Sequence, residues 1–237
     1  MKPWIRVQES RTADGSVVEL VRRDNEYSLR VAGKVLMGSR SQGSEIQLAE
    51  RTLEKVSARP APRVLIGGLG FGYTLQAALR VLPAAAVVEV VELMPFMIEL
   101  NHGLLGELAG SPLRDARVKV TQADIVQQLK HKNETYDAIL LDVDNGPRAF
   151  TQESNGWLYK QPGLVRMGKL LTFGGALGVW SVSQDDAFTG QLRASGYQVE
   201  THAVRSRPNG KGDRHMIWVA QPLRKPEPPN PDAPIDD

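Results

Sequence analysis

The sequence has no cysteine among its 237 residues, which excludes disulfides, thiolate zinc sites and a cysteine nucleophile. It also has no apolar run near the ~20 residues that a membrane span needs, and its start, "MKPWIRVQES", lacks the apolar core of a signal peptide. Neither sign of charge dominates, with Lys+Arg 29 against Asp+Glu 27, which argues against a dedicated nucleic-acid-binding protein. We therefore expect a cytoplasmic protein that has no membrane partner.

Histidine is scarce as well. The four histidines are scattered along the chain without the spacing of metal ligands: His102, His131, His202 and His215. We expect no bound metal.

Residues 1–58 indicate a small N-terminal β segment followed by a helix. Up to about residue 40, polar and apolar residues alternate in short runs divided by turn signals at Asp14-Gly15 and Ala32-Gly33, which predicts three or four antiparallel strands. From Ser44 the spacing becomes helical, and Ser44 is the expected N-cap.

Residues 59–222 indicate an α/β domain in which apolar strands alternate with helices, as in a parallel sheet covered on both faces. The predicted strands are Arg63–Ile66, Ala86–Glu92, Val118–Thr121, Ala138–Asp142 and Ala176–Trp180. The predicted helices are Tyr73–Val81, Met94–Gly103, Ile125–His131, Gly156–Leu171 and Gln184–Ser195. A terminal antiparallel hairpin, Tyr197–Val204 with Met216–Ala220, completes seven strands, and the proline-rich residues 223–237 are expected to be disordered.

The stretch "VLIGGLGFGYTL" (64–75) runs from a strand through a glycine loop into a helix. Gly68, Gly70 and Gly72 let backbone N–H groups approach a ligand at the helix N-terminus. The dinucleotide pattern G-x-G-x-x-G is incomplete because Tyr73 stands at its third glycine, and the lysine of a P-loop is absent. A plain tight turn is the alternative.

Acidic residues follow the next three strands, at the edge where open α/β sheets bind ligands. Glu92 stands 22 residues after Gly70, a spacing typical of a ribose-binding carboxylate, with a solvated strand end as the alternative. Asp124 is placed to accept from an exocyclic amine beside the apolar Ile125, or to cap a helix, and the two roles are compatible. Asp142 and Asp144 can bind a cation or take a proton from an amine, with a solvated acidic turn as the alternative.

This order of a glycine loop followed by separate acids indicates an adenosine-containing ligand with no required phosphate. It favours an S-adenosyl sulfonium over NAD.

From Tyr27 to Ala220 the chain resembles the spermidine synthase branch of the S-adenosylmethionine-dependent methyltransferase superfamily. The resemblance rests on "YSLRVAGKVLMGSRSQGSEIQLAERTL", "RVLIGGLGFGYTL", "VVEVVELMPFMIEL", "DARVKVTQAD", "YDAILLDVDNGP" and "LYKQPGLVRMGKLLTFGGALGV", which follow in the family's order. It implies a small β segment ahead of a seven-stranded Rossmann-like domain, and an enzyme that uses S-adenosylmethionine or its decarboxylated form.

The resemblance also implies site residues. Glu92 with the adjacent Leu93 would bind the ribose, Asp124 with Ile125 the adenine, and the loop from Gly68 to Gly72, including Phe71, the methionine-derived side. Asp142, helped by Asp144, would deprotonate the attacking amine. A small-molecule acceptor such as a polyamine is implied, and a homodimer would be compatible with the family.

The departures from the family concern its amine-binding acids. Phe71 stands where aminopropyltransferases carry an aspartate, Asn145 and Gly146 replace an Asp-Pro pair, and no tyrosine occurs around Gly43-Ser44-Glu45. Asp144, or Glu45 if it points inward, is a candidate replacement.

Because Phe71 removes an anion, methyl transfer is slightly favoured. Aminopropyl transfer from decarboxylated S-adenosylmethionine and a non-catalytic nucleoside-binding module are the alternatives. The loop "RSRPNGKGDR" (205–214) is either a solvated hairpin loop or a contact for an anionic partner.

Overall fold

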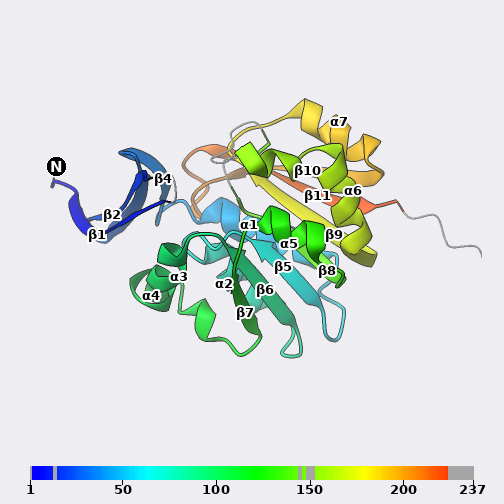
Figure 1. Ribbon diagram of the computed structural model, residues 1–237, viewed down its shortest axis with the longest axis horizontal. Coiled ribbons are helices and arrows are strands. Elements are labelled where there is room, and N and C mark those ends of the chain that lie inside the picture. The colour runs from blue at the N-terminus through cyan, green and yellow to red at the C-terminus, as the bar shows by residue number, and fades with distance from the viewer. Residues whose placement is uncertain (1, 13–14, 144–145, 148–152, 224–237) are drawn as a thin grey trace, which may run out of the picture.

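The chain folds as a four-stranded sheet beside a larger α/β unit (Figure 1). The computed structural model describes residues 2–12, 15–143, 146–147 and 153–223. The small sheet is antiparallel in the order β1-β2-β3-β4, with β1 at Ile5–Arg11, β2 at Val17–Arg23, β3 at Glu26–Val31 and β4 at Lys34–Gly38. Four strands therefore form where three or four were expected.

The larger sheet has seven strands in the order β10-β11-β9-β8-β5-β6-β7. Strands β5 to β9 are parallel, and β11 and β10 are antiparallel. Their bounds are β5 Arg63–Gly67, β6 Val87–Glu92, β7 Val118–Gln122, β8 Tyr136–Leu141, β9 Leu171–Ser181, β10 Tyr197–Arg205 and β11 Arg214–Pro222. The expected Rossmann-like sheet with a terminal hairpin is confirmed.

Helices cover both faces of this sheet (Figure 1). Helices α1 (Gly43–Glu54) and α2 (Tyr73–Val81) pack on one face, and α5 (Ile125–His131), α6 (Gln161–Leu170) and α7 (Asp186–Ala194) pack on the other. The two faces follow the alternation along β5, where Val64 and Ile66 point to the first face and Leu65 to the second. In the part of the chain that the structure describes, no helix has the length and apolarity to cross a membrane.

The remaining helical segments lie beside the small sheet or between the larger elements. They are α3 (Pro95–His102), α4 (Leu104–Leu108) and the 3₁₀ turns η1 (Pro112–Arg114) and η2 (Glu153–Trp157). Leu20 and Leu29 of the small sheet pack with Phe96 and Leu105 of α3 and α4 in one buried cluster. This contact holds the small sheet over the carboxyl ends of β5 and β6.

Three expectations differ from the structure. Ser44 is not the N-cap of α1, because the helix begins at Gly43 and the Ser44 hydroxyl bonds His215 instead. Helix α4 was not expected, since five residues carry too little periodic pattern. The predicted helix Gly156–Leu171 starts only at Gln161, beside Pro162, and β9 begins directly after it. Residues 224–237 of the predicted disordered tail lie outside the described residues.

Candidate active site

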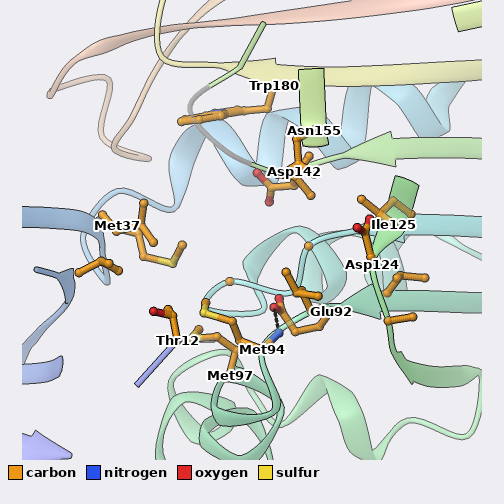
Figure 2. Close-up of a pocket in the computed structure, with 18 of the residues that line it drawn as sticks. Thr12, Met37, Glu92, Met94, Met97, Asp124, Ile125, Asp142, Asn155 and Trp180 are labelled. Atoms are coloured by element: carbon orange, nitrogen blue, oxygen red, sulfur yellow. Dashed lines mark hydrogen bonds between the residues drawn. The ribbon is translucent and has the colours of Figure 1, made fainter. Parts of the chain in front are cut away.

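A cavity of about 560 Å³ lies at the carboxyl edge of the parallel strands, and the small sheet forms part of its wall (Figure 2). In Figure 2 Asp124 and Ile125 stand at one end, Glu92 near the middle, and Asp142 with Trp180 on the far side of the cavity from Met97. Residues from both sheets line it: Thr12, Ser16, Val31, Leu36, Met37, Glu45, Gly68, Gly70, Val91, Glu92, Leu93, Met94, Met97, Ala123, Asp124, Ile125, Asp142, Val143, Asn155 and Trp180.

The glycine loop lines the cavity with backbone at Gly68 and Gly70. Gly68 has φ +86°, and a Cβ there would lie 2.3 Å from the carbonyl oxygen of Asp142. Its backbone is therefore pressed against the end of β8, where only glycine fits. Gly72 does not line the cavity; it faces Asn101, whose Nδ2 holds the carbonyl of Gly70 at 2.9 Å.

Phe71 lies differently from the prediction. Its side chain is only 1% exposed, is absent from the cavity wall and belongs to the apolar cluster under the small sheet. Its ring stacks on Tyr73, with centroids 6.1 Å apart. The positive φ of Gly70 and Gly72 on either side turns this residue inward. The expected contact between the Phe71 side chain and the cofactor is not found, because the ring is part of the core, and position 71 supplies no anion to the cavity.

Glu92 is buried at the end of β6 and accepts two backbone hydrogen bonds, from the N–H groups of Leu69 at 2.9 Å and Met94 at 2.8 Å. Burial raises the pKa of the Glu92 carboxyl, and these backbone donors oppose the rise. The N–H groups of Leu93 and Gly70 also stabilise the carboxylate, which is thereby fixed in the cavity wall. Leu93 lies beside it in the wall.

Asp124 combines the two roles considered for it. Its carboxylate caps α5 by accepting from the N–H of Val126 at 2.7 Å, and it also lines the cavity. The buried Ile125 lines the cavity next to it. A carboxylate beside an apolar surface suits a ring that carries an amino group.

Two further carboxyl groups in the cavity wall, Glu45 and Asp142, interact electrostatically. Asp142 accepts a hydrogen bond from the Thr74 hydroxyl at 2.6 Å, and burial raises its pKa to about 6. Burial, and then the charge of Asp142, raises the pKa of Glu45 well above its ordinary value. Burial and the Glu45 carboxylate likewise raise the pKa of Tyr73 to about 12. Glu45, a candidate replacement acid only if its side chain pointed inward, does line the cavity.

Asp142 and Glu45 have different surroundings, which affect their ionised forms differently. The Thr74 donor stabilises the ionised form of Asp142. Glu45 has no such donor among the described contacts, and the charge of Asp142 contributes to the rise in its pKa. Asp144 and Asn145, the other candidates that follow β8, lie outside the described residues.

The charge of the wall has one sign. Its described residues include four carboxyl groups, Glu45, Glu92, Asp124 and Asp142, and no lysine, arginine or histidine. Elsewhere in the described chain, no three histidine, cysteine or acidic side chains come together in a metal-binding group.

Sequence reasoning missed several wall residues. Trp180 lies one residue before the end of β9, lines the cavity and packs edge-on against His215, with ring centroids 4.8 Å apart. Asn155 and Met37 also line the cavity. Their spacing in the sequence carries no signal, because only the tertiary arrangement of distant segments brings them together.

No family model and no curated protein matches the sequence, but solved structures match its fold. A spermidine synthase from Thermotoga maritima superposes with a TM-score of 0.67 at 13% identity, covering 92% of this chain and 74% of the other. A spermidine synthase in complex with the transition state analogue AdoDATO gives 0.66 at 12% identity, with 92% and 73% covered. A probable spermidine synthase from Corynebacterium glutamicum ATCC 13032 gives 0.64 at 15% identity, with 93% and 81% covered. The chain thus has the fold of spermidine synthases, as the resemblance implied.

Proposed function

From this shared fold and the acidic cavity, we propose that the protein is a transferase that moves an aminopropyl group from decarboxylated S-adenosylmethionine to an amine. The observation that carries the proposal is the wall of four carboxyl groups without a basic side chain among its described residues. Decarboxylated S-adenosylmethionine carries a sulfonium and an ammonium, both positive. S-Adenosylmethionine adds a carboxylate, which the ionised acids of the wall would repel.

The sequence favours S-adenosylmethionine as the donor, whereas the acids that line the cavity favour its decarboxylated form. The sequence favours methyl transfer because position 71 lacks an anion. Position 71 supplies no anion, since the Phe71 ring is buried in the apolar cluster, but the acids that line the cavity favour the donor without a carboxylate.

Different residues of the cavity wall bind different parts of the donor. Asp124 and Ile125 bind the adenine, and Glu92, beside Leu93, accepts from the ribose hydroxyls. The backbone at Gly68 and Gly70 supports the part of the donor next to the sulfonium. These roles follow the order of the side chains across the cavity in Figure 2.

Asp142 acts as the base. An amine attacks carbon only through a free lone pair, so its ammonium form must lose a proton first. As the new C–N bond forms, the C–S bond breaks and its electron pair stays on sulfur in methylthioadenosine, while the released proton goes to Asp142. The Thr74 hydroxyl holds this carboxylate in place at 2.6 Å. Glu45 adds negative charge when ionised and attracts the cationic amine.

Calorimetric titration with the two donors tests the proposal. We expect the decarboxylated donor to bind at least ~10-fold more tightly, a difference of about 1.4 kcal/mol. Glu45→Gln should narrow the preference, whereas Glu50→Gln, exposed on the same helix, should leave it unchanged. Tighter binding of S-adenosylmethionine would refute the choice of donor.

The competing hypothesis is a binding module without catalysis. Release of methylthioadenosine in the presence of an amine, abolished in Asp142→Asn while donor binding persists, would exclude it. Donor binding without release, for the wild type and a panel of amines, would favour it.

A further inference from the structure

Trp180 lines the acidic cavity and is only partly buried (Figure 2). The other three tryptophans of the chain are engaged elsewhere. A basic side chain lies over the rings of Trp4 and Trp157, and Trp218 is fully buried in the core. Among the described residues, no lysine or arginine lies over the Trp180 ring. This ring can therefore receive a cation from outside the chain.

The pairing of β8 with β9 places Trp180 next to Asp142. Leu141 and Val179 are partners in these parallel strands, so the residues that follow them are neighbours about 5 Å apart at Cα. Asp142 continues the ladder, since its N–H donates to the carbonyl of Gly67 at 2.9 Å. Alternation turns both side chains to the sheet face that carries α1, where Trp180 packs on the apolar cluster.

Helix α1 brings Glu45 to the same face of the sheet. A Cβ on Gly178 would lie 2.1 Å from the Thr52 hydroxyl oxygen, so α1 crosses β9 two residues before Trp180. Glu45 precedes Thr52 by seven residues, about two helical turns, and therefore shares its side of the helix. Since Glu45 also lines the cavity, two carboxyl groups and one indole ring lie around the same space.

His215 fixes the position of the indole ring. Trp180 pairs with Ile217 of β11, and His215, two residues before Ile217, points to the same face. The two rings pack edge-on with centroids 4.8 Å apart. The other contact of His215 is the Ser44 hydroxyl at 2.8 Å from Nδ1, next to Glu45 in the chain. The ring and the start of α1 are thus held by one residue.

The indole N–H does not explain why a tryptophan stands here. Among the described residues, the Trp180 Nε1–H has no hydrogen-bond partner, and it is shielded from solvent. A leucine would fill part of the space without burying an unpaired donor. What the indole offers in addition is the negative face of its π system, which attracts a cation within about 6 Å of the ring centroid.

The order of the strands puts this ring on the acceptor side of the cavity. Going across the sheet, neighbouring strands run β7, β6, β5, β8, β9. The proposed donor contacts follow the first three strands at Asp124, Glu92 and Gly68, and the base Asp142 follows β8. At about 4.8 Å per strand, β9 lies about 10 Å from β5 and about 19 Å from β7. Trp180 therefore lies beyond the base, away from the adenosine.

We infer that Trp180 is a specificity-determining residue, which binds the ammonium form of the acceptor through its ring beside Asp142 and Glu45. The inference rests on the proposed function and deepens it by naming what recognises the acceptor. The ring attracts the cation, and Asp142 then takes its proton, so that the free amine attacks the donor. A neutral molecule of the same shape gains nothing from the ring.

Butylamine and butan-1-ol form a matched pair of probes, since they differ in charge and share a carbon chain. Their dissociation constants are measured at pH 8 by NMR chemical-shift titration, first without donor and then with methylthioadenosine in the nucleoside site. We expect the wild type to prefer butylamine. Trp180→Leu should reduce this preference ~3- to 30-fold, the effect of a cation–π contact in a partly to fully desolvated site. Trp180→Phe, which keeps a ring, should lose less.

A second tryptophan provides the control. Trp157 packs on the opposite face of the sheet, under Lys130, and does not line the cavity. Trp157→Leu removes the same side chain and should leave both dissociation constants within about twofold. Incorporation of 5-fluorotryptophan and 5,7-difluorotryptophan provides a test that does not depend on how well Trp180→Leu folds. Fluorine withdraws charge from the ring face with little change of shape, so the preference for butylamine should fall stepwise.

The ratio of the two dissociation constants separates cation binding from packing. Loss of a merely structural role would weaken both probes equally, and that result overturns the inference. A preference that Trp180→Leu leaves unchanged overturns it too, as does a loss confined to binding of the decarboxylated donor, which would place the ring at the sulfonium. A preference that depends on the ring supports the inference even if no transfer occurs, whereas the choice of donor is decided by the donor titration alone.

Discussion

Burial disfavours the charged form of Asp142. The substitution Asp142→Asn can therefore separate the effect of this residue on stability from its effect on transfer. Burial raises its pKa from 3.8 to about 6, which corresponds to about 3 kcal/mol at most, since each pKa unit is about 1.4 kcal/mol. The sign follows from linkage: a carboxyl whose pKa is raised by folding destabilises the folded state progressively as the pH rises from 3.8 to about 6, and fully above that. Below 3.8 the group is protonated in both states and this difference disappears.

We therefore expect Asp142→Asn to be more stable than the wild type at about pH 8, by up to about 3 kcal/mol. Near pH 4 the gain should shrink to less than about 1 kcal/mol. The amide oxygen can still accept from Thr74, so the existing hydrogen bond is retained. Urea denaturation at the two pH values measures the difference.

Transfer should respond in the opposite direction. Removal of a general base lowers kcat by about 10²–10⁴-fold, while donor affinity should stay within a few-fold. In the wild type, kcat/KM should fall as the pH drops through about 6, where Asp142 takes up its proton. A variant that is less stable than the wild type at pH 8, or equally different at both pH values, would contradict the burial argument.

Three further substitutions test the glycine loop and the ribose acid. Glu92→Gln should weaken binding of the decarboxylated donor by about 10- to 100-fold, the range for hydrogen bonds to a charged group, and calorimetry with an unchanged Tm would assign the loss to binding. Gly68→Ala should lower the free energy of unfolding by 2 kcal/mol or more, roughly, because its Cβ would meet the Asp142 carbonyl; Gly190→Ala, in a helix with open space around it, should raise it by about 0.5–1 kcal/mol. Phe71→Asp should destabilise the fold by about 3 kcal/mol or more without increasing transfer, and a stable variant with higher activity would refute the placement of Phe71 in the core.

The sequence predicts the sheet well because local pattern and burial agree there. Helices α2 and α5 occur at the predicted residues, since each starts directly after a loop with a clear capping or glycine signal. The acids after β6, β7 and β8 line one cavity as expected, because parallel strands end at a common edge.

The direction of individual side chains could not be predicted in the same way. The spacing places Phe71 in the glycine loop, but the positive φ angles of its neighbours turn its ring away from the ligand site. Glu45 points into the cavity because the start of α1 is fixed by Ser206 and His215. Those partners are more than 150 residues away in the sequence, so no local pattern reports them.

The acid pair is the part of the site that stability alone does not account for. Desolvation raises the pKa of both carboxyl groups, the charge of Asp142 raises that of Glu45 further, and both shifts oppose folding at neutral pH. Within the described residues, no basic side chain in the cavity wall compensates Glu45 and Asp142. A cationic ligand would compensate them on binding and would lower both pKa values, releasing protons. Titration of the amine acceptor in buffers of different ionisation enthalpy should therefore show proton release near pH 6, and its absence would argue that the cation binds elsewhere.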